Sequence, residues 1–73
     1  MADEKIWLER EIKRLESESA RLEGFVRQRR AEVHRASTSR DSQHAQGQLA
    51  KAEADLRNTK TALASYRQNL RRY

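Results

Sequence analysis

The sequence predicts an all-α fold, a two-helix antiparallel coiled-coil hairpin that could dimerise into a four-helix bundle. The 73 residues are 37% charged and 5% aromatic, with two glycines and no proline, which favours long exposed helices over strands. Two leucine-rich tracts, 8–36 and 49–73, carry apolar residues that alternate by four and three positions. The tracts are out of phase, so one continuous helix would lose its apolar stripe between them.

The first helix is expected over about residues 3–37. Asp3 and Glu4 suit its N-terminus and Arg35 suits its C-terminus, because a helix dipole is positive at the first end and negative at the last. Its expected core positions are Leu8, Ile12, Leu15, Ser19, Leu22, Val26, Arg29, Val33 and Ala36.

A joint is expected at about residues 38–42, within a serine-rich stretch, and a second helix at about 43–73. Asp41 or Ser42 could cap this helix. The whole chain, 1–73, is therefore expected to be a single helical hairpin. The core positions of the second helix are Leu49, Ala52, Leu56, Thr59, Leu63, Tyr66, Leu70 and Tyr73.

Arg29 occupies a core position that an apolar residue would otherwise fill. We expect its aliphatic stem to pack beside Leu56 while the guanidinium reaches water. The alternative is that a polar core residue selects the register or the partner, as in other coiled coils.

The net charge of +5 is divided unevenly along the chain. Residues 1–24 hold seven acids and five bases, and residues 25–40 hold five bases and one acid. Residues 41–55 hold three acids and one base, whereas 56–73 hold five bases and no acid. Folding the chain back on itself therefore sets basic segments beside acidic ones.

The charges also select a register for the hairpin. In the core, this register pairs Leu15 with Leu70, Leu22 with Leu63, Val26 with Thr59, Val33 with Ala52 and Ala36 with Leu49. At the flanking positions, it pairs Glu16 with Arg67, Glu23 with Lys60 and Arg30 with Glu53. Exposed pairs contribute only about 0.2–1 kcal/mol each, so they select register more than they stabilise the hairpin.

The sequence gives no sign of an enzyme, a cofactor site or a small-molecule substrate. It has no cysteine and no phosphate loop, and His34 and His44 lack partners at metal-ligand spacing, so we expect no metal and no cofactor. A two-helix layer offers no enclosed pocket for catalysis. The longest apolar run has three residues, so we expect no membrane span and a cytoplasmic location.

The leading functional hypothesis is a non-catalytic interaction or oligomerisation module that binds a protein partner or a second copy of itself. In the preferred register, apolar and aromatic residues overhang the paired core, as partner surfaces commonly do. The candidate partner-binding residues are Ile6, Trp7, Leu8 and Tyr73.

The alternative hypothesis is a basic helical arm that binds nucleic acid, either tRNA or DNA, through the half of the hairpin nearest the joint. Bases in this half could contact phosphates, although the only aromatic residue available for base stacking there is Phe25. The candidate residues are Arg27, Arg29, Arg30, Arg35, Arg40 and Lys51.

The segment Leu8-Glu-Arg-Glu-Ile-Lys-Arg-Leu-Glu-Ser-Glu-Ser-Ala-Arg-Leu-Glu-Gly24, with Leu49-Ala-Lys-Ala-Glu-Ala-Asp-Leu56 after the break, resembles the C-terminal coiled-coil arm of valyl-tRNA synthetases. In that family the arm is an antiparallel hairpin that contacts tRNA. The resemblance therefore implies tRNA contacts near the positions of the basic residues between the two segments. The apolar, proline-containing motif that the family carries near its tip is absent from this chain.

Overall fold

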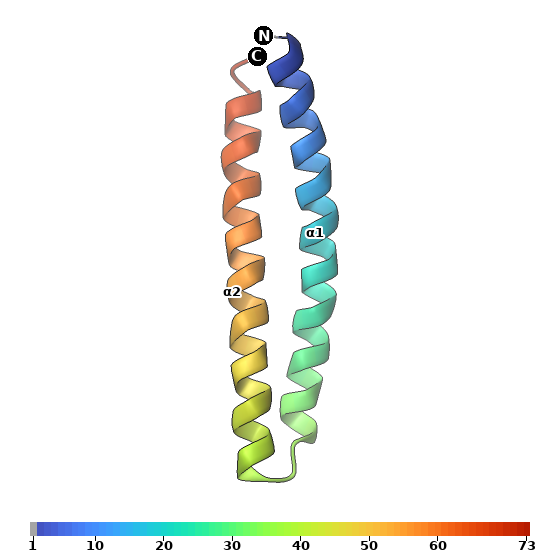
Figure 1. The fold of residues 1–73 in the computed structure, drawn as a ribbon, viewed down its shortest axis with the longest axis vertical. Coiled ribbons are helices and arrows are strands. Elements are labelled where there is room, and N and C mark those ends of the chain that lie inside the picture. Colours follow the sequence, from blue (N-terminus) through green and yellow to red (C-terminus); the bar gives the residue numbers. More distant parts are fainter. Residues whose placement is uncertain (1) are drawn as a thin grey trace.

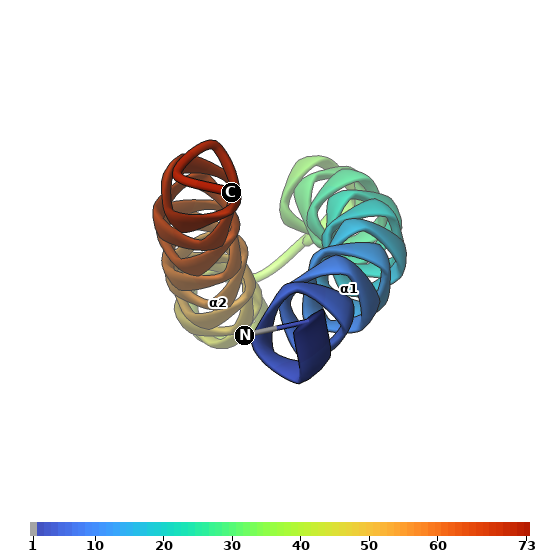
Figure 2. The same ribbon diagram turned by 90° about the horizontal axis from the view of Figure 1, so that it is seen from above.

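The computed structural model describes residues 2–73 as two antiparallel helices, α1 (Ala2–Arg35) and α2 (Ser39–Leu70). The helices lie side by side over their whole length, with the joint at one end of the hairpin (Figure 1). Seen along the long axis, they form a single layer (Figure 2). The described chain contains no strand, so the predicted all-α hairpin is confirmed.

The joint is shorter than predicted, because α2 begins within the serine-rich stretch. Thr38 has extended backbone torsions, φ −120° and ψ 157°, and its Oγ1 accepts a hydrogen bond of 3.1 Å from the amide of Asp41. This bond satisfies one of the first amides of the helix, which have no partner inside the helix. The predicted cap at Asp41 or Ser42 is therefore wrong, and the joint comprises residues 36–38 instead of 38–42.

Removing this cap tests its contribution to stability. Thr38→Ala should lower the free energy of unfolding by about 1 kcal/mol, whereas Thr38→Ser should keep most of it because the hydroxyl remains. Urea denaturation followed by circular dichroism, at one protein concentration, measures both variants. Ser37→Ala is the matched control, since Ser37 is an exposed joint residue outside both helices. An equal loss in the control would contradict the capping role of Thr38.

The core is a strip of side chains between the helices, and α1 supplies most of it. The fully buried residues of the predicted seams are Leu8, Ile12, Leu15, Ser19, Leu22, Val26 and Leu63. The seam residues from Arg29 to Ala36, and all those of α2 between Leu49 and Leu70 except Leu63, are half-buried. Tyr73 lies beyond the end of α2 and is exposed.

Ala45 is buried as well, although the seam of the second helix was predicted to begin at Leu49. Ala45 lies one four-residue step before Leu49 and continues the same seam. The break in the apolar stripe is therefore shorter than the sequence suggested, which agrees with the short joint.

The observed core register differs from the predicted one by one heptad. Leu63 was expected to face Leu22, but it packs in one cluster with Ile12 and Leu15, and Tyr66 and Leu70 pack against that cluster. The cause is the joint. Because α1 ends earlier and α2 begins earlier than expected, each α2 residue lies farther along α1 from the joint.

Candidate functional site

With the heptads lettered a to g so that Ile12 of α1 and Leu49 of α2 are at position a, the core seams are positions a and d. Positions b and e of both helices form one face of the hairpin, named here the ion-pair face. All three predicted ion pairs cross between the helices on this face. Arg67 Nη2 lies 2.9 Å from Glu16 Oε2, Lys60 Nζ lies 3.3 Å from Glu23 Oε1, and Arg30 Nη2 lies 4.0 Å from Glu53 Oε2. They form despite the shifted core because long side chains lean toward the N-terminus of their own helix, so antiparallel partners reach past each other.

The ion-pair face has more bases than acids. Its bases are Lys13, Arg27, Arg30, Arg57, Lys60 and Arg67, and its acids are Glu9, Glu16, Glu23 and Glu53. No aromatic residue occupies position b or e of either helix. This face is therefore charged and partly neutralised by its own ion pairs.

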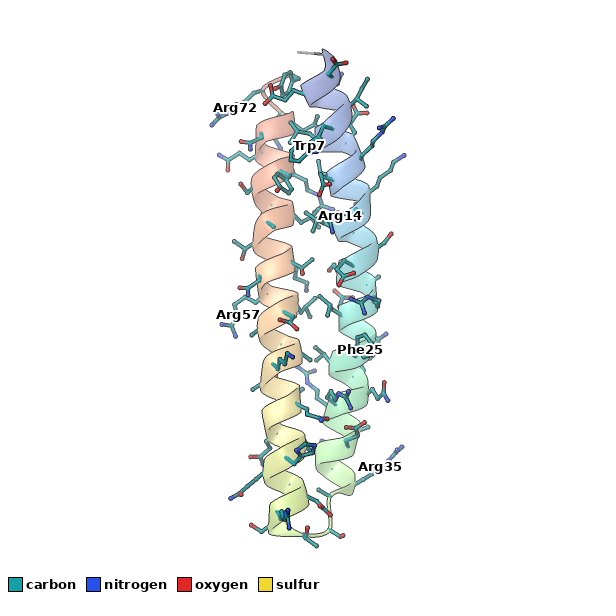
Figure 3. All side chains as sticks on the ribbon, viewed as in Figure 1. Trp7, Arg14, Phe25, Arg35, Arg57 and Arg72 are labelled. Atoms are coloured by element: carbon teal, nitrogen blue, oxygen red, sulfur yellow. The ribbon has the colours of Figure 1, made fainter. Side chains whose placement is uncertain are left out.

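Positions c and g form the opposite face, named here the aromatic face. Trp7 and Phe25 lie on it and are 51% and 37% exposed. The Trp7 ring reaches from α1 toward α2 (Figure 3) and packs edge-on against Tyr66, with ring centroids 5.7 Å apart. The guanidinium carbon of Arg21 lies 5.3 Å from the centroid of the Phe25 ring, within the range of a cation–π interaction. Both exposed helical aromatic rings are thus held in place from within the chain.

The aromatic face has the opposite charge balance. Its bases are Arg14, Arg21, Arg35 and Lys51, and its acids are Glu4, Glu11, Glu18, Glu32, Asp41 and Asp55. The net positive charge of the chain is therefore displaced away from the face that carries the aromatic rings.

Two ion pairs within α1 line the aromatic face between Trp7 and Phe25. Arg14 Nη2 lies 2.7 Å from Glu11 Oε2, and Arg21 pairs in the same way with Glu18. The hydrogen bond from Arg21 lowers the pKa of Glu18 below its ordinary value of 4.5, and the pKa of Arg21 rises in return. Stabilisation from Glu18 is thus present above pH 4.5 and is lost as the pH falls through the lowered pKa.

A groove between the helices runs beside Phe25 on the aromatic face. It is lined by aliphatic carbon from Leu22 and Ala52, by the cations of Arg21, Arg29 and Lys51, and by Gln48 and Asp55. Cations beside an aromatic ring suit a ligand with its own π face, and the carboxylate of Asp55 could accept an N–H from that ligand.

The predicted partner-binding residues do not all lie at the surface. Ile6, Trp7 and Tyr73 are 47%, 51% and 52% exposed, but Leu8 is 3% exposed and belongs to the core. The expected overhang does not exist, because the core register is shifted by one heptad. A hydrogen bond to the carboxylate of Glu4 raises the pKa of Tyr73, which places Tyr73 level with the start of α1.

The predicted nucleic-acid-binding residues do not converge on one surface. Arg29 Nη1 donates a hydrogen bond of 3.0 Å to Glu32, and Arg29 lines the groove beside Phe25. Arg30 pairs with Glu53 on the ion-pair face. By heptad position, Arg27 lies on the ion-pair face, Arg35 and Lys51 lie on the aromatic face, and Arg40 lies on the outer side of α2.

Phe25 and Tyr66 help to form the aromatic face, a role that the sequence pattern did not predict. Phe25 was considered only as a possible stacking platform for bases, and Tyr66 only as a core residue. The available signal was spacing, since Trp7 and Phe25 are 18 residues apart, which is five helical turns, and must therefore share a face.

Searches of protein-family models, characterised proteins and solved structures found no significant match to this chain. Among residues 2–73, neither helix is long and apolar enough to cross a membrane. No cluster of three or more potential metal ligands occurs in the same described residues.

Proposed function

We propose that this chain is a non-catalytic helical-hairpin module that binds protein, either a partner or a second copy of itself, through its aromatic face. The observation that carries this proposal is the exposure of Trp7 and Phe25 on one face of α1. Aromatic residues are enriched in protein interfaces, and tryptophan is among the residues that most often contribute a large share of the binding energy.

The local setting of each ring supports this proposal. Tyr66 fixes the orientation of Trp7, and Arg21 fixes that of Phe25. A side chain that is already ordered loses less conformational entropy when it binds. The groove beside Phe25 adds aliphatic surface and cations that a partner side chain could contact.

The basic alternative has a weaker basis. Positive charge on the ion-pair face is partly neutralised by Glu16, Glu23 and Glu53, and no aromatic ring accompanies it. Proteins that bind single-stranded nucleic acid usually combine a basic groove with aromatic stacking. This face therefore favours phosphate contacts only through Arg27, Arg57 and Lys13, which are outside the interhelical ion pairs.

Site-specific photo-cross-linking tests the proposal. A photoreactive phenylalanine analogue placed at position 28 or 58 lies on the aromatic face, and the same analogue at position 20 or 64 lies on the ion-pair face; all four positions are exposed. In an extract of cells that express the chain, we expect protein adducts from 28 and 58. These adducts should disappear when Trp7→Ala and Phe25→Ala are combined, because the anchoring rings are then absent.

Titration with tRNA and with duplex DNA at two salt concentrations gives the competing outcome. Affinity that rises steeply at low salt and falls in Arg27→Gln and Arg57→Gln would support the nucleic-acid arm instead. Protein adducts that form equally from both faces, or that persist without Trp7 and Phe25, would refute the aromatic face as the binding surface.

A further inference from the structure

The aromatic face of α1 carries a second row of residues with coiled-coil spacing, separate from the core seam. The row alternates by four and three positions and consists of Trp7, Glu11, Arg14, Glu18, Arg21 and Phe25. All six residues are at heptad position c or g, beside the core seam and not within it. The row begins and ends with an exposed aromatic ring.

This row is self-complementary when it pairs with the same row of a second, antiparallel copy. If a second α1 lies antiparallel over the first and the middle of the row is the centre of the pairing, each residue meets a partner of matching chemistry. The pairs are Trp7 with Phe25, Glu11 with Arg21, and Arg14 with Glu18, each formed twice by symmetry. Every charged residue of the row therefore faces an opposite charge, and every aromatic residue faces an aromatic one.

We propose that two copies of this chain associate through their aromatic faces as an antiparallel two-fold dimer, in which Trp7 of each copy enters the Phe25 groove of the other. This inference rests on the proposed function and names its partner, a second copy. A two-fold interface requires a self-complementary surface, because each residue meets the same patch on the other copy. The row from Trp7 to Phe25 supplies that surface.

The position of the row allows the two hairpins to overlap over nearly their full length. Trp7 and Phe25 are about 27 Å apart along α1 at 1.5 Å per residue. Their midpoint is residue 16, close to the middle of α1 (Ala2–Arg35). A two-fold axis at this level, perpendicular to the helices, therefore places α1 over α1 and α2 over α2 with little of either hairpin projecting.

The groove beside Phe25 suits the indole of the second copy. The guanidinium groups of Arg21 and Arg29 and the ammonium of Lys51 line this groove, so cations are available to the π face of the indole. Asp55 lies in the same groove and can accept the indole N–H. Trp7 cannot enter the groove of its own chain, because it is fixed about 27 Å away along α1.

On the aromatic face, α2 carries no row of like charges that would repel the α2 of the second copy. Besides Lys51 and Asp55, its positions c and g between 48 and 69 are uncharged: Gln48, Asn58, Ala62, Ser65 and Asn69. The ion-pair face lacks the same self-complementarity. An antiparallel pairing there, centred on residue 18, would bring two pairs of opposite charges together, Glu9 with Arg27 and Lys13 with Glu23. It would also set Ile6 opposite Arg30 and Glu16 opposite Ala20, and it pairs no aromatic ring.

The single tryptophan reports the contact directly. Sedimentation equilibrium of the full chain should give a monomer–dimer equilibrium, and Trp7 emission should shift to shorter wavelength as the dimer forms. Phe25→Ala should raise the dissociation constant by about tenfold or more and reverse the emission shift. The matched control is Arg27→Ala, which changes an exposed residue of the ion-pair face and should alter the constant by less than about twofold.

Cysteine cross-linking tests the antiparallel direction, because the chain has no other cysteine. Arg14→Cys and Arg35→Cys both replace an exposed arginine at position c. Position 14 lies near the two-fold axis and should form a disulfide between copies under mild oxidation. Position 35 lies at the joint end, far from its equivalent in the other copy, and should remain reduced.

Each result has a separate meaning. A monomer at every concentration would overturn the self-dimer, while photo-cross-links to another protein from position 28 would still uphold the proposed function. A dimer in which Arg35→Cys cross-links as readily as Arg14→Cys would overturn the antiparallel arrangement. A dimer with unchanged affinity and Trp7 emission in Phe25→Ala, with helicity retained by circular dichroism, would overturn the contact between Trp7 and the Phe25 groove.

Discussion

Leu63→Ala should lower the free energy of unfolding by about 2–5 kcal/mol, the range measured for leucine truncations in protein cores. Leu63 is the only leucine of α2 that is fully buried, and it packs against Ile12 and Leu15 of α1. Because the core is a single strip, few neighbouring side chains can move to fill the space. The midpoint of thermal unfolding should fall by roughly 10 °C or more in a chain of this size.

Leu70→Ala is the matched control, with the same change in the same helix. Leu70 is half-buried and is the last residue of α2, so its removal should lower the unfolding free energy by less than half as much. Both variants are measured by thermal and urea denaturation at a concentration where the chain is monomeric, since association also stabilises the folded state. Equal losses at the two positions would contradict the central role of Leu63 in the core.

Replacing both glycines with alanine should raise the free energy of unfolding by about 2 kcal/mol. Gly24 and Gly47 lie inside α1 and α2 with ordinary helical torsions, and glycine in a helix interior is about 1 kcal/mol less favourable than alanine. A methyl group at Gly24 would meet only Arg27 Nη2 at 4.0 Å, and one at Gly47 would meet nothing within 4 Å. The two gains should be additive because the sites share no contact.

Ala50→Gly provides the opposite change at an exposed helical position of α2 and should destabilise the hairpin by about 1 kcal/mol. Urea denaturation of the single and double glycine variants, beside this control, gives the comparison. The prediction would be contradicted if Ala50→Gly lowers the free energy of unfolding while Gly24→Ala and Gly47→Ala leave it unchanged. Helix propensity would then not limit stability at the two glycines.

The fold could be predicted from periodicity and charge because both act over many residues. The spacing of leucines gave two helices, and the distribution of charge gave the ion pairs of Glu16, Glu23 and Arg30 with α2. The core register was wrong because it depends on the exact length of the joint. Thr38 followed three residues later by Asp41 is a helix-start signal, but the cap was predicted at Asp41 or Ser42 instead.

The candidate surface was harder to predict because a sum of charge along segments does not separate the two faces of a helix. Counting by segment made the half nearest the joint look basic, whereas counting by heptad position assigns Arg27 and Lys51 to opposite faces. The pairing of Trp7 with Tyr66 depends on the core register and could not be derived while that register was wrong.

The three-residue joint also determines the order in which the contacts between the helices form during folding. The entropy lost on closing a loop grows with its length, so contacts near the joint form most readily, and the bond between Glu16 and Arg67, 51 residues apart, forms later. The contact between Trp7 and Tyr66 closes a longer loop still, so it is among the last contacts to form and the first to open. A second molecule that binds Trp7 would therefore stabilise the end of the hairpin that opens most easily. Binding would in this way favour the completely folded hairpin.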